Sequence, residues 1–135
     1  MERRLEALPG RFAIWRLPPD APLPQVMPTA GWVFVARTPD EVSLLLPAQV
    51  PPPAGAQPGP EWWRAWRVAG ALDFALVGVL ADLTHALAQA GIPLLAVSTF
   101  DTDYVFVPAP QAAAAVRAWR AAGWVVPPAL GDSTT

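Results

Sequence analysis

The sequence of 135 residues contains no cysteine, no lysine and a single histidine, His85. Without cysteine the chain forms no disulfide, offers no thiol nucleophile and cannot bind a metal through thiolate groups. A lone histidine has no second histidine with which to share a metal ion or to activate a serine. Because all nine basic residues are arginine and the formal net charge is −2, the sequence also lacks the positive surface expected of proteins that bind nucleic acids or anionic membranes.

Long apolar runs are absent too. The N-terminus is charged and is interrupted early by Pro9-Gly10, so it does not have the form of a secretory signal. The longest apolar stretch, residues 74–83, contains Asp82 and falls short of the ~20 residues that span a bilayer. We therefore expect a soluble, cytoplasmic protein, and its 53% hydrophobic residues are enough for a folded core.

Motifs that carry enzyme chemistry are missing. The stretch Val68-Ala69-Gly70-Ala71 has one glycine where phosphate-binding loops need several. The pair Asp101 and Asp103 resembles the start of a calcium loop, but the central glycine and the late glutamate of such a loop are absent. No acid–base pair or activated nucleophile is visible. We expect neither a metal, nor a cofactor, nor catalytic activity.

Proline divides the chain into two parts. Residues 47–60 hold six prolines and two glycines, a composition that favours neither a helix nor a central strand. We expect a front module over residues 1–50, a proline-rich linker over residues 51–60 and a second module over residues 61–127. Residues 128–135 are expected to form a disordered tail.

The second module alternates strand and helix patterns. Apolar residues recur at helical spacing after Asp73, a residue suited to cap a helix, and again after Pro110. Aromatic and β-branched runs lie between them. The pattern predicts strands over 62–68, 92–99, 104–107 and 124–126 and helices over 74–91 and 110–122. This order, βαββαβ, is that of the ferredoxin-like fold, in the α+β class.

The front module looks like a degenerate copy of the second. A strand ending at Trp15-Arg16-Leu17 and a hairpin over residues 34–47, with its turn at 38–41, echo strands of the second module. Between them, the prolines of residues 18–28 leave no room for a full helix. We expect three strands and at most one short turn of helix.

Seven tryptophans are an unusual feature of so short a chain. Stacking on nucleotide bases is one interpretation, but such platforms accompany basic grooves, and this chain is acidic. Packing in the core and at a subunit interface is the better interpretation. A ferredoxin-like sheet is covered by helices on one face only, so we also expect a homodimer or a higher homo-oligomer.

Two polar clusters of the second module could form a binding site. Residues 70–74 lie where a strand leads into a helix, and residues 98–103 lie at the end of another strand. If the two clusters meet, helix N–H groups could receive a carboxylate, and Asp73 or Asp103 could receive an ammonium group. The alternative is that Asp73 is only a helix cap and that Asp101 and Asp103 are only turn residues.

Three stretches of the second module resemble a known family. Residues 67–80, the sequence Ala90-Gly91-Ile92-Pro93 and residues 97–107 with their Ser-Thr-Phe-Asp-Thr-Asp motif are similar to uncharacterised bacterial ACT-domain proteins of the branch that includes the CASTOR-type arginine sensors. Residues 8–14 and 37–41 resemble the front module of the same family. The resemblance implies two tandem ACT-like, ferredoxin-like modules, the first with a degenerate first helix.

The resemblance also implies a function and a site. The function is that of a regulatory sensor that binds a small molecule, an amino acid by analogy, without catalysis. Carried over by position, the ligand-binding residues are Gly70, Asp73, Phe74 and Val77 in the first segment and Thr99, Phe100 and Asp103 in the second. The alternative is a ligand-independent interaction module that docks a partner enzyme through its tryptophan-bearing surface.

Overall fold

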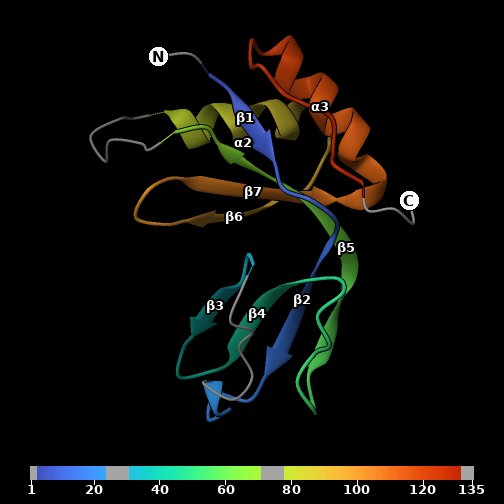
Figure 1. Ribbon diagram of the computed structural model, residues 1–135. Coiled ribbons are helices and arrows are strands. Elements are labelled where there is room, and N and C mark those ends of the chain that lie inside the picture. Colours follow the sequence, from blue (N-terminus) through green and yellow to red (C-terminus); the bar gives the residue numbers. More distant parts are fainter. Residues whose placement is uncertain (1–2, 24–30, 71–77, 132–135) are drawn as a thin grey trace. The chain divides into compact units, whose positions relative to one another are not determined.

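The structure is a computed structural model that describes residues 3–23, 31–70 and 78–131 (Figure 1). Its internal contacts divide the chain into two compact units. Unit 1 comprises Met1–Gly10 and Trp63–Thr135, and unit 2 comprises Arg11–Trp62. The candidate functional residues lie in unit 1.

The sheet of unit 1 has four antiparallel strands in the order β1-β5-β7-β6. The strands are β1 (Leu5–Ala7), β5 (Gln57–Val68, from Trp63 onward in this unit), β6 (Leu95–Ser98) and β7 (Asp103–Pro108). The three strands predicted over 62–68, 92–99 and 104–107 are confirmed, with ends shifted by a few residues.

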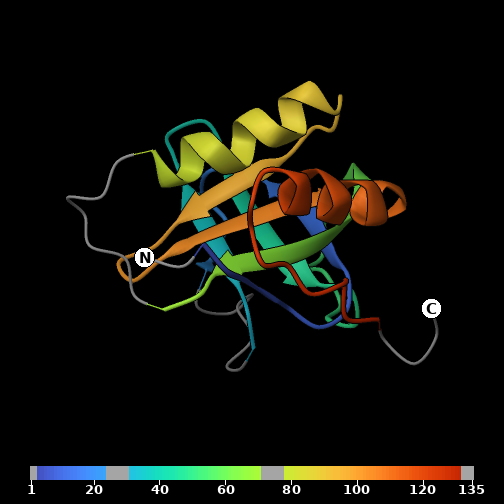
Figure 2. The ribbon, with the colours of Figure 1, turned by 90° about the horizontal axis from the view of Figure 1, so that it is seen from above.

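Both helices of the described part of unit 1 cover the same face of this sheet (Figure 2). They are α2 (Val79–Gln89) and α3 (Ala112–Ala121), the latter preceded by the short 3-10 helix η1 (Ala109–Gln111). The expected helical faces are confirmed, since Leu83 and Leu87 are buried in α2 while His85 is exposed. In the core Trp119 packs edge-on against Trp66, with ring centroids 5.3 Å apart.

The edge of the sheet next to β5 is filled by an unexpected strand. The N-terminal strand β1 pairs with β5 and buries Leu5, whereas the expected last strand, residues 124–126, forms only an isolated bridge from Val125 to Arg4. Residues 124–126 do not extend into a longer strand because the next residues, Pro127 and Pro128, have no N–H groups with which to continue a hydrogen-bond ladder. The βαββα part of the module is thus closed by a strand from the other end of the chain.

The strands of unit 2 follow the expected pattern. They are β2 (Phe12–Leu17), β3 (Phe34–Arg37) and β4 (Val42–Pro47), with β4 paired antiparallel to both others. The predicted turn over residues 38–41 is confirmed, since Thr38 Oγ1 accepts hydrogen bonds of 3.1 Å from the N–H groups of Asp40 and Glu41. The proline-rich stretch where a degenerate helix was expected lies partly outside the described residues.

Residues 57–60, which we expected in the linker, form the beginning of β5. This part of β5 lies beside β2, where Gly59 closely approaches Ile14. Pro58 and Pro60 are two residues apart, so their missing N–H groups point to the same side of the strand. The other side keeps its donors, and one edge of the strand can still pair.

The start of helix α2 and the C-terminal residues 128–130 differ from the sequence-based expectation. Helix α2 begins at Val79, after Gly78 in a left-handed conformation (φ 83°), and Asp73, the expected cap, lies outside the described residues. Residues 128–130 were expected in a disordered tail, but they are ordered parts of unit 1. Leu130 forms an isolated β-bridge with Pro9, and its carbonyl accepts a hydrogen bond from the N–H of Gly10. Among the described residues, no helix is long and apolar enough to cross a membrane.

Candidate functional site

Gly70, the described residue of the first polar cluster, lies with the second cluster at one end of the unit 1 sheet. Because β5 and β7 are antiparallel, the end of β5 lies beside the start of β7. The hydroxyl of Thr102, in the turn before β7, donates a buried 2.8 Å hydrogen bond to the carbonyl oxygen of Val68 at the end of β5. This bond fixes the turn over residues 99–102 at the end of β5, where Gly70 has a left-handed φ of 76°, a conformation that glycine adopts readily.

Hydrogen bonds within the turn hold its shape. The hydroxyl of Thr99 donates to the carbonyl of Thr102 at 3.0 Å and accepts from its N–H at 3.3 Å. At the base of the turn, Ser98 Oγ donates to Asp103 Oδ1 at 2.6 Å. Phe100 stands at the tip and is 82% exposed. Thr99 and Asp103 therefore have structural roles in the turn.

A pocket of about 420 Å³ opens at this end of the sheet. Its lining comes from β1, β5, β7 and the two connecting segments: Glu6, Arg67, Val68, Gly70, Asp101, Thr102 and Tyr104. We call this pocket the candidate site. Strand register places Glu6, Arg67 and Tyr104 opposite one another on three neighbouring strands, so their side chains share one face of the sheet. Trp66 and Val68, on the alternate positions of β5, face the helices.

Arg67 is the central charged group of the candidate site. Its Nε donates to Glu6 Oε1 at 3.3 Å. The hydrogen bond with Tyr104 and then the negative charge of Glu6 raise the pKa of Arg67, and partial burial opposes them only in part. Because the pKa is raised, the stabilisation from these contacts is present at every pH below the ordinary pKa of arginine, and the guanidinium keeps its charge at every physiological pH. The lining therefore offers one permanent cation beside two carboxylates, those of Glu6 and Asp101.

Of the residues expected to bind a ligand, the structure places Gly70 in the lining of the candidate site. Thr99, Phe100 and Asp103 lie in the adjacent turn but do not line the pocket. Asp103 alternates with Tyr104 along β7 and points to the helix-covered face, the face of buried Val105. Asp73, Phe74 and Val77 lie outside the described residues.

Glu6, Arg67, Val68 and Tyr104 were not predicted, and Asp101 and Thr102 were expected in the polar cluster but not named as ligand-binding residues. The alternation of polar and apolar residues along a strand was a usable signal for Arg67 and Tyr104. Arg67 lies between the apolar residues Trp66 and Val68, and Tyr104 directly precedes the apolar residues of β7. Glu6 gave no such signal, because it reaches the site through pairing with a residue 61 positions away.

Comparison with known proteins agrees with this fold. Residues 59–120 match the family model of the ACT domain. The chain has the ACT fold, which is ferredoxin-like and of the α+β class, with β1 in the place of the last strand of the βαββαβ arrangement. A comparison with curated proteins finds no match.

Solved structures with the same fold cover most of the chain. The structure of protein Atu0741 from Agobacterium tumefaciens has a TM-score of 0.83 at 25% identity, covering 98% of this chain and 95% of its own. Protein VC0802 from Vibrio cholerae, described as a possible transport protein, has a TM-score of 0.70 at 20% identity, with 90% of each chain covered. The regulatory subunit of aspartate kinase from Thermus flavus has a TM-score of 0.60 at 15% identity, covering 87% of this chain and 95% of its own.

Proposed function

We propose that this protein is a regulatory sensor that binds an amino acid, or a similar small zwitterion, without catalysing its conversion. The observation that carries the proposal is the candidate site, where one arginine and two carboxylates line a pocket of about 420 Å³. A zwitterion carries one charge of each sign, and this lining offers a partner for both. A free amino acid is also small enough for the volume.

In the proposed complex the ligand carboxylate binds the guanidinium of Arg67, whose planar fork suits bidentate contact. The ligand ammonium group binds the carboxylates of Asp101 and Glu6. Gly70 has no side chain and lets the ligand approach the backbone. Binding would exchange part of the half-exposed Arg67–Glu6 pair for contacts with the ligand.

The resemblance of the sequence to CASTOR-type sensors adds a second group of residues to the proposal: Asp73, Phe74, Val77, Thr99, Phe100 and Asp103. These residues flank the candidate site in the chain or in the fold. In this extended form the ligand reaches past the turn to the opposite face of β7, where its positive end binds Asp103 and Phe100 covers its side chain. Arginine is then the first amino acid to test, because it carries a second positive group.

Two features support a role without catalysis. The sequence offers no cysteine, and its one histidine lies on the exposed face of α2. The ACT fold is shared with a protein described as a regulatory subunit, that of aspartate kinase. The alternative, an interaction module that docks through tryptophan, has less surface to use, since Trp63, Trp66, Trp119 and Trp124 are buried.

A thermal-shift screen of the full chain against the proteinogenic amino acids tests the proposal. A ligand that binds only the folded state raises the melting temperature by mass action. We expect one amino acid or a few related ones to raise it in a concentration-dependent manner. No shift with any amino acid at millimolar concentration, or an equal small shift with all of them, would contradict the proposal.

Titration calorimetry of two variants with the amino acid found then locates the site. Arg67→Gln should lower affinity about 30-fold or more, because it removes a charged partner from the ligand carboxylate. Asp103→Asn should cause a similar loss if the extended form holds and no loss if the ligand stays within the candidate site. Arg16→Gln, the same change at an exposed position of β2, is the matched control. Unchanged affinity in both variants would remove the ligand from this end of the sheet.

A further inference from the structure

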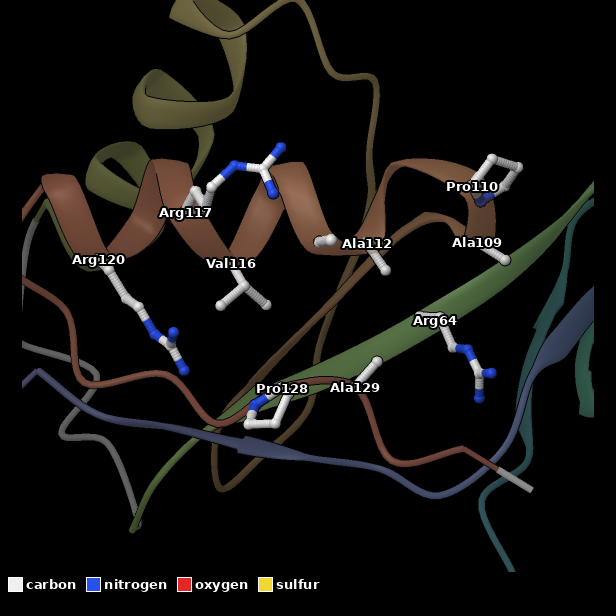
Figure 3. Close-up of a pocket in the computed structure, with 10 residues that line it drawn as sticks. Arg64, Ala109, Pro110, Ala112, Val116, Arg117, Arg120, Pro128 and Ala129 are labelled. Atoms are coloured by element: carbon white, nitrogen blue, oxygen red, sulfur yellow. The ribbon is translucent and has the colours of Figure 1, made fainter. Parts of the chain in front are cut away.

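A second concave site of unit 1 shares no residue with the candidate site. It has a volume of about 450 Å³ and lies between α3, β5 and residues 128–129 (Figure 3). Three arginines line it, Arg64, Arg117 and Arg120, and the rest of the lining is alanine, proline and valine. Among the described residues no acidic side chain contributes to it. We call it the arginine groove.

Arg64 is a buried cation without a carboxylate. Its side chain comes from the middle of β5 and the residue is only 8% exposed. Its Nη1 donates to the carbonyl oxygen of Leu130 at 2.9 Å, but no carboxylate in the described part of the chain is within ion-pair distance. Burial of a charge is costly unless an opposite charge accompanies it, so an anion in the groove would stabilise this residue.

The other two arginines come from α3. They are three residues apart, which places them on adjacent positions of one helix side. Arg120 is held by two hydrogen bonds from Nε and Nη2 to the carbonyl oxygen of Val126, at 2.9 and 2.6 Å. Figure 3 shows Arg120 reaching from α3 toward the segment that holds Pro128. Arg117 is exposed and extends along the outer side of the helix.

The groove has charge at its ends and apolar walls between them. In Figure 3, Arg64 and Arg120 lie toward opposite ends, and Val116 and Ala112 lie between. At the Arg64 end the lining also includes the first residues of α3, the end of the helix that carries the partial positive charge of the helix dipole. Guanidinium groups bind carboxylate and phosphate in the same bidentate manner.

We propose that the arginine groove binds a small organic dianion, a molecule with two carboxylate or phosphoryl groups joined by a short apolar chain. One anionic group contacts Arg64 at the end of the groove where α3 begins. The other contacts Arg120, and Arg117 adds positive charge at the rim. The site is separate from the candidate site, so the protein would hold a zwitterion and a dianion at different places of the same unit.

Calorimetric titration of the full chain at constant ionic strength tests this proposal, with glutarate and 3-phosphonopropionate as dianionic probes. Butyrate, with one charge, and glutaramide, with none, are the matched controls. We expect at least one dianion to bind about tenfold or more tightly than butyrate, and glutaramide not to bind. Which dianion binds better distinguishes a dicarboxylate from a phosphoryl ligand. Equal binding of the dianions and butyrate would overturn the proposal.

Variants locate the binding. Arg120→Gln should lower dianion affinity about tenfold, and Arg117→Gln, which changes a side chain at the rim of the groove, by a smaller factor. Arg16→Gln removes the same charge from unit 2 and should leave the affinity unchanged. Arg67→Gln should also leave it unchanged, so failure of the dianion proposal and failure of the proposed function are distinguishable. Equal losses in Arg16→Gln and in the two groove variants would reduce the effect to net charge and overturn the proposal.

Discussion

At the scale of single residues, the direction of a side chain decides whether it can reach the candidate site. Asp103 and Tyr104 are neighbours in sequence, but strand alternation sends them to opposite faces of the sheet. The sequence pattern drew attention to Asp103 because it stands in a polar motif. The structure brings Tyr104 beside Arg67 instead. Residue type alone therefore indicated the right segment and only part of the right side-chain set.

The hydroxyl of Thr102 joins the two halves of the candidate site, so Thr102→Val should destabilise the fold. The variant keeps the shape but leaves the buried carbonyl of Val68 without its 2.8 Å donor. We expect a loss of about 1–3 kcal/mol in the free energy of unfolding. Urea denaturation measures it. Thr84→Val, the same change on the partly exposed side of α2, is the control and should cost no more than about 0.5 kcal/mol. Equal losses would mean that the bond to Val68 contributes nothing specific.

At the scale of elements, local patterns were sufficient for most of unit 1. The helices were predictable because their apolar residues repeat every three or four positions, as with Leu83 and Leu87. The β6–β7 hairpin was predictable because its strands are joined by a short polar turn. The pairing of β1 with β5 was not, since it joins the two separate chain segments of unit 1, and no local pattern encodes such a contact.

The strand β1 should be a structural part of unit 1 and not a loose N-terminus. Leu5 is 1% exposed and belongs to the same core as Trp66 and Trp119. Leu5→Ala should therefore lower the free energy of unfolding by about 2–5 kcal/mol, the usual cost of a leucine-sized cavity. Leu130→Ala is the control, because this leucine is 48% exposed and should lose about 1 kcal/mol or less. Denaturant titration of both variants measures the difference, and similar costs would contradict the assignment.

The proline-containing start of β5 should tolerate no side chain at Gly59. A Cβ placed there would lie 2.5 Å from Cγ2 of Ile14 on β2. Gly59→Ala should cost about 1–3 kcal/mol by overpacking. Ile14→Ala removes the obstructing methyl group, so the double variant should cost less than the sum of the two single variants. A double-mutant cycle by thermal unfolding checks this, and additive costs would show that the two residues are not in contact.

At the scale of the whole molecule, net charge conceals local charge. The chain is acidic, with a formal charge of −2, which gives no reason to expect a nucleic-acid surface. Yet one concave site combines Arg67 with two carboxylates, and the other gathers three arginines. Composition cannot predict such separation, because it depends on which strands and helices the fold brings together. The net charge of the whole chain therefore does not predict which small ligands the individual pockets bind.

We also propose that the protein forms a homodimer or a higher homo-oligomer. Large apolar side chains remain partly or largely exposed in the chain by itself, among them Phe100 at 82% and Trp62 at 42%. Apolar surface of this kind is typical of subunit contacts, and closed homo-oligomers are the commonest assemblies. Size-exclusion chromatography with light scattering at high micromolar concentration should give a mass at least twice the 14.4 kDa of one chain. Phe100→Ser, a change at an exposed turn, should shift the mass toward that of one chain without lowering the melting temperature of the folded unit. A single-chain mass for the unaltered protein at that concentration would refute the assembly, and a fully assembled Phe100→Ser variant would place the subunit contact elsewhere on the surface.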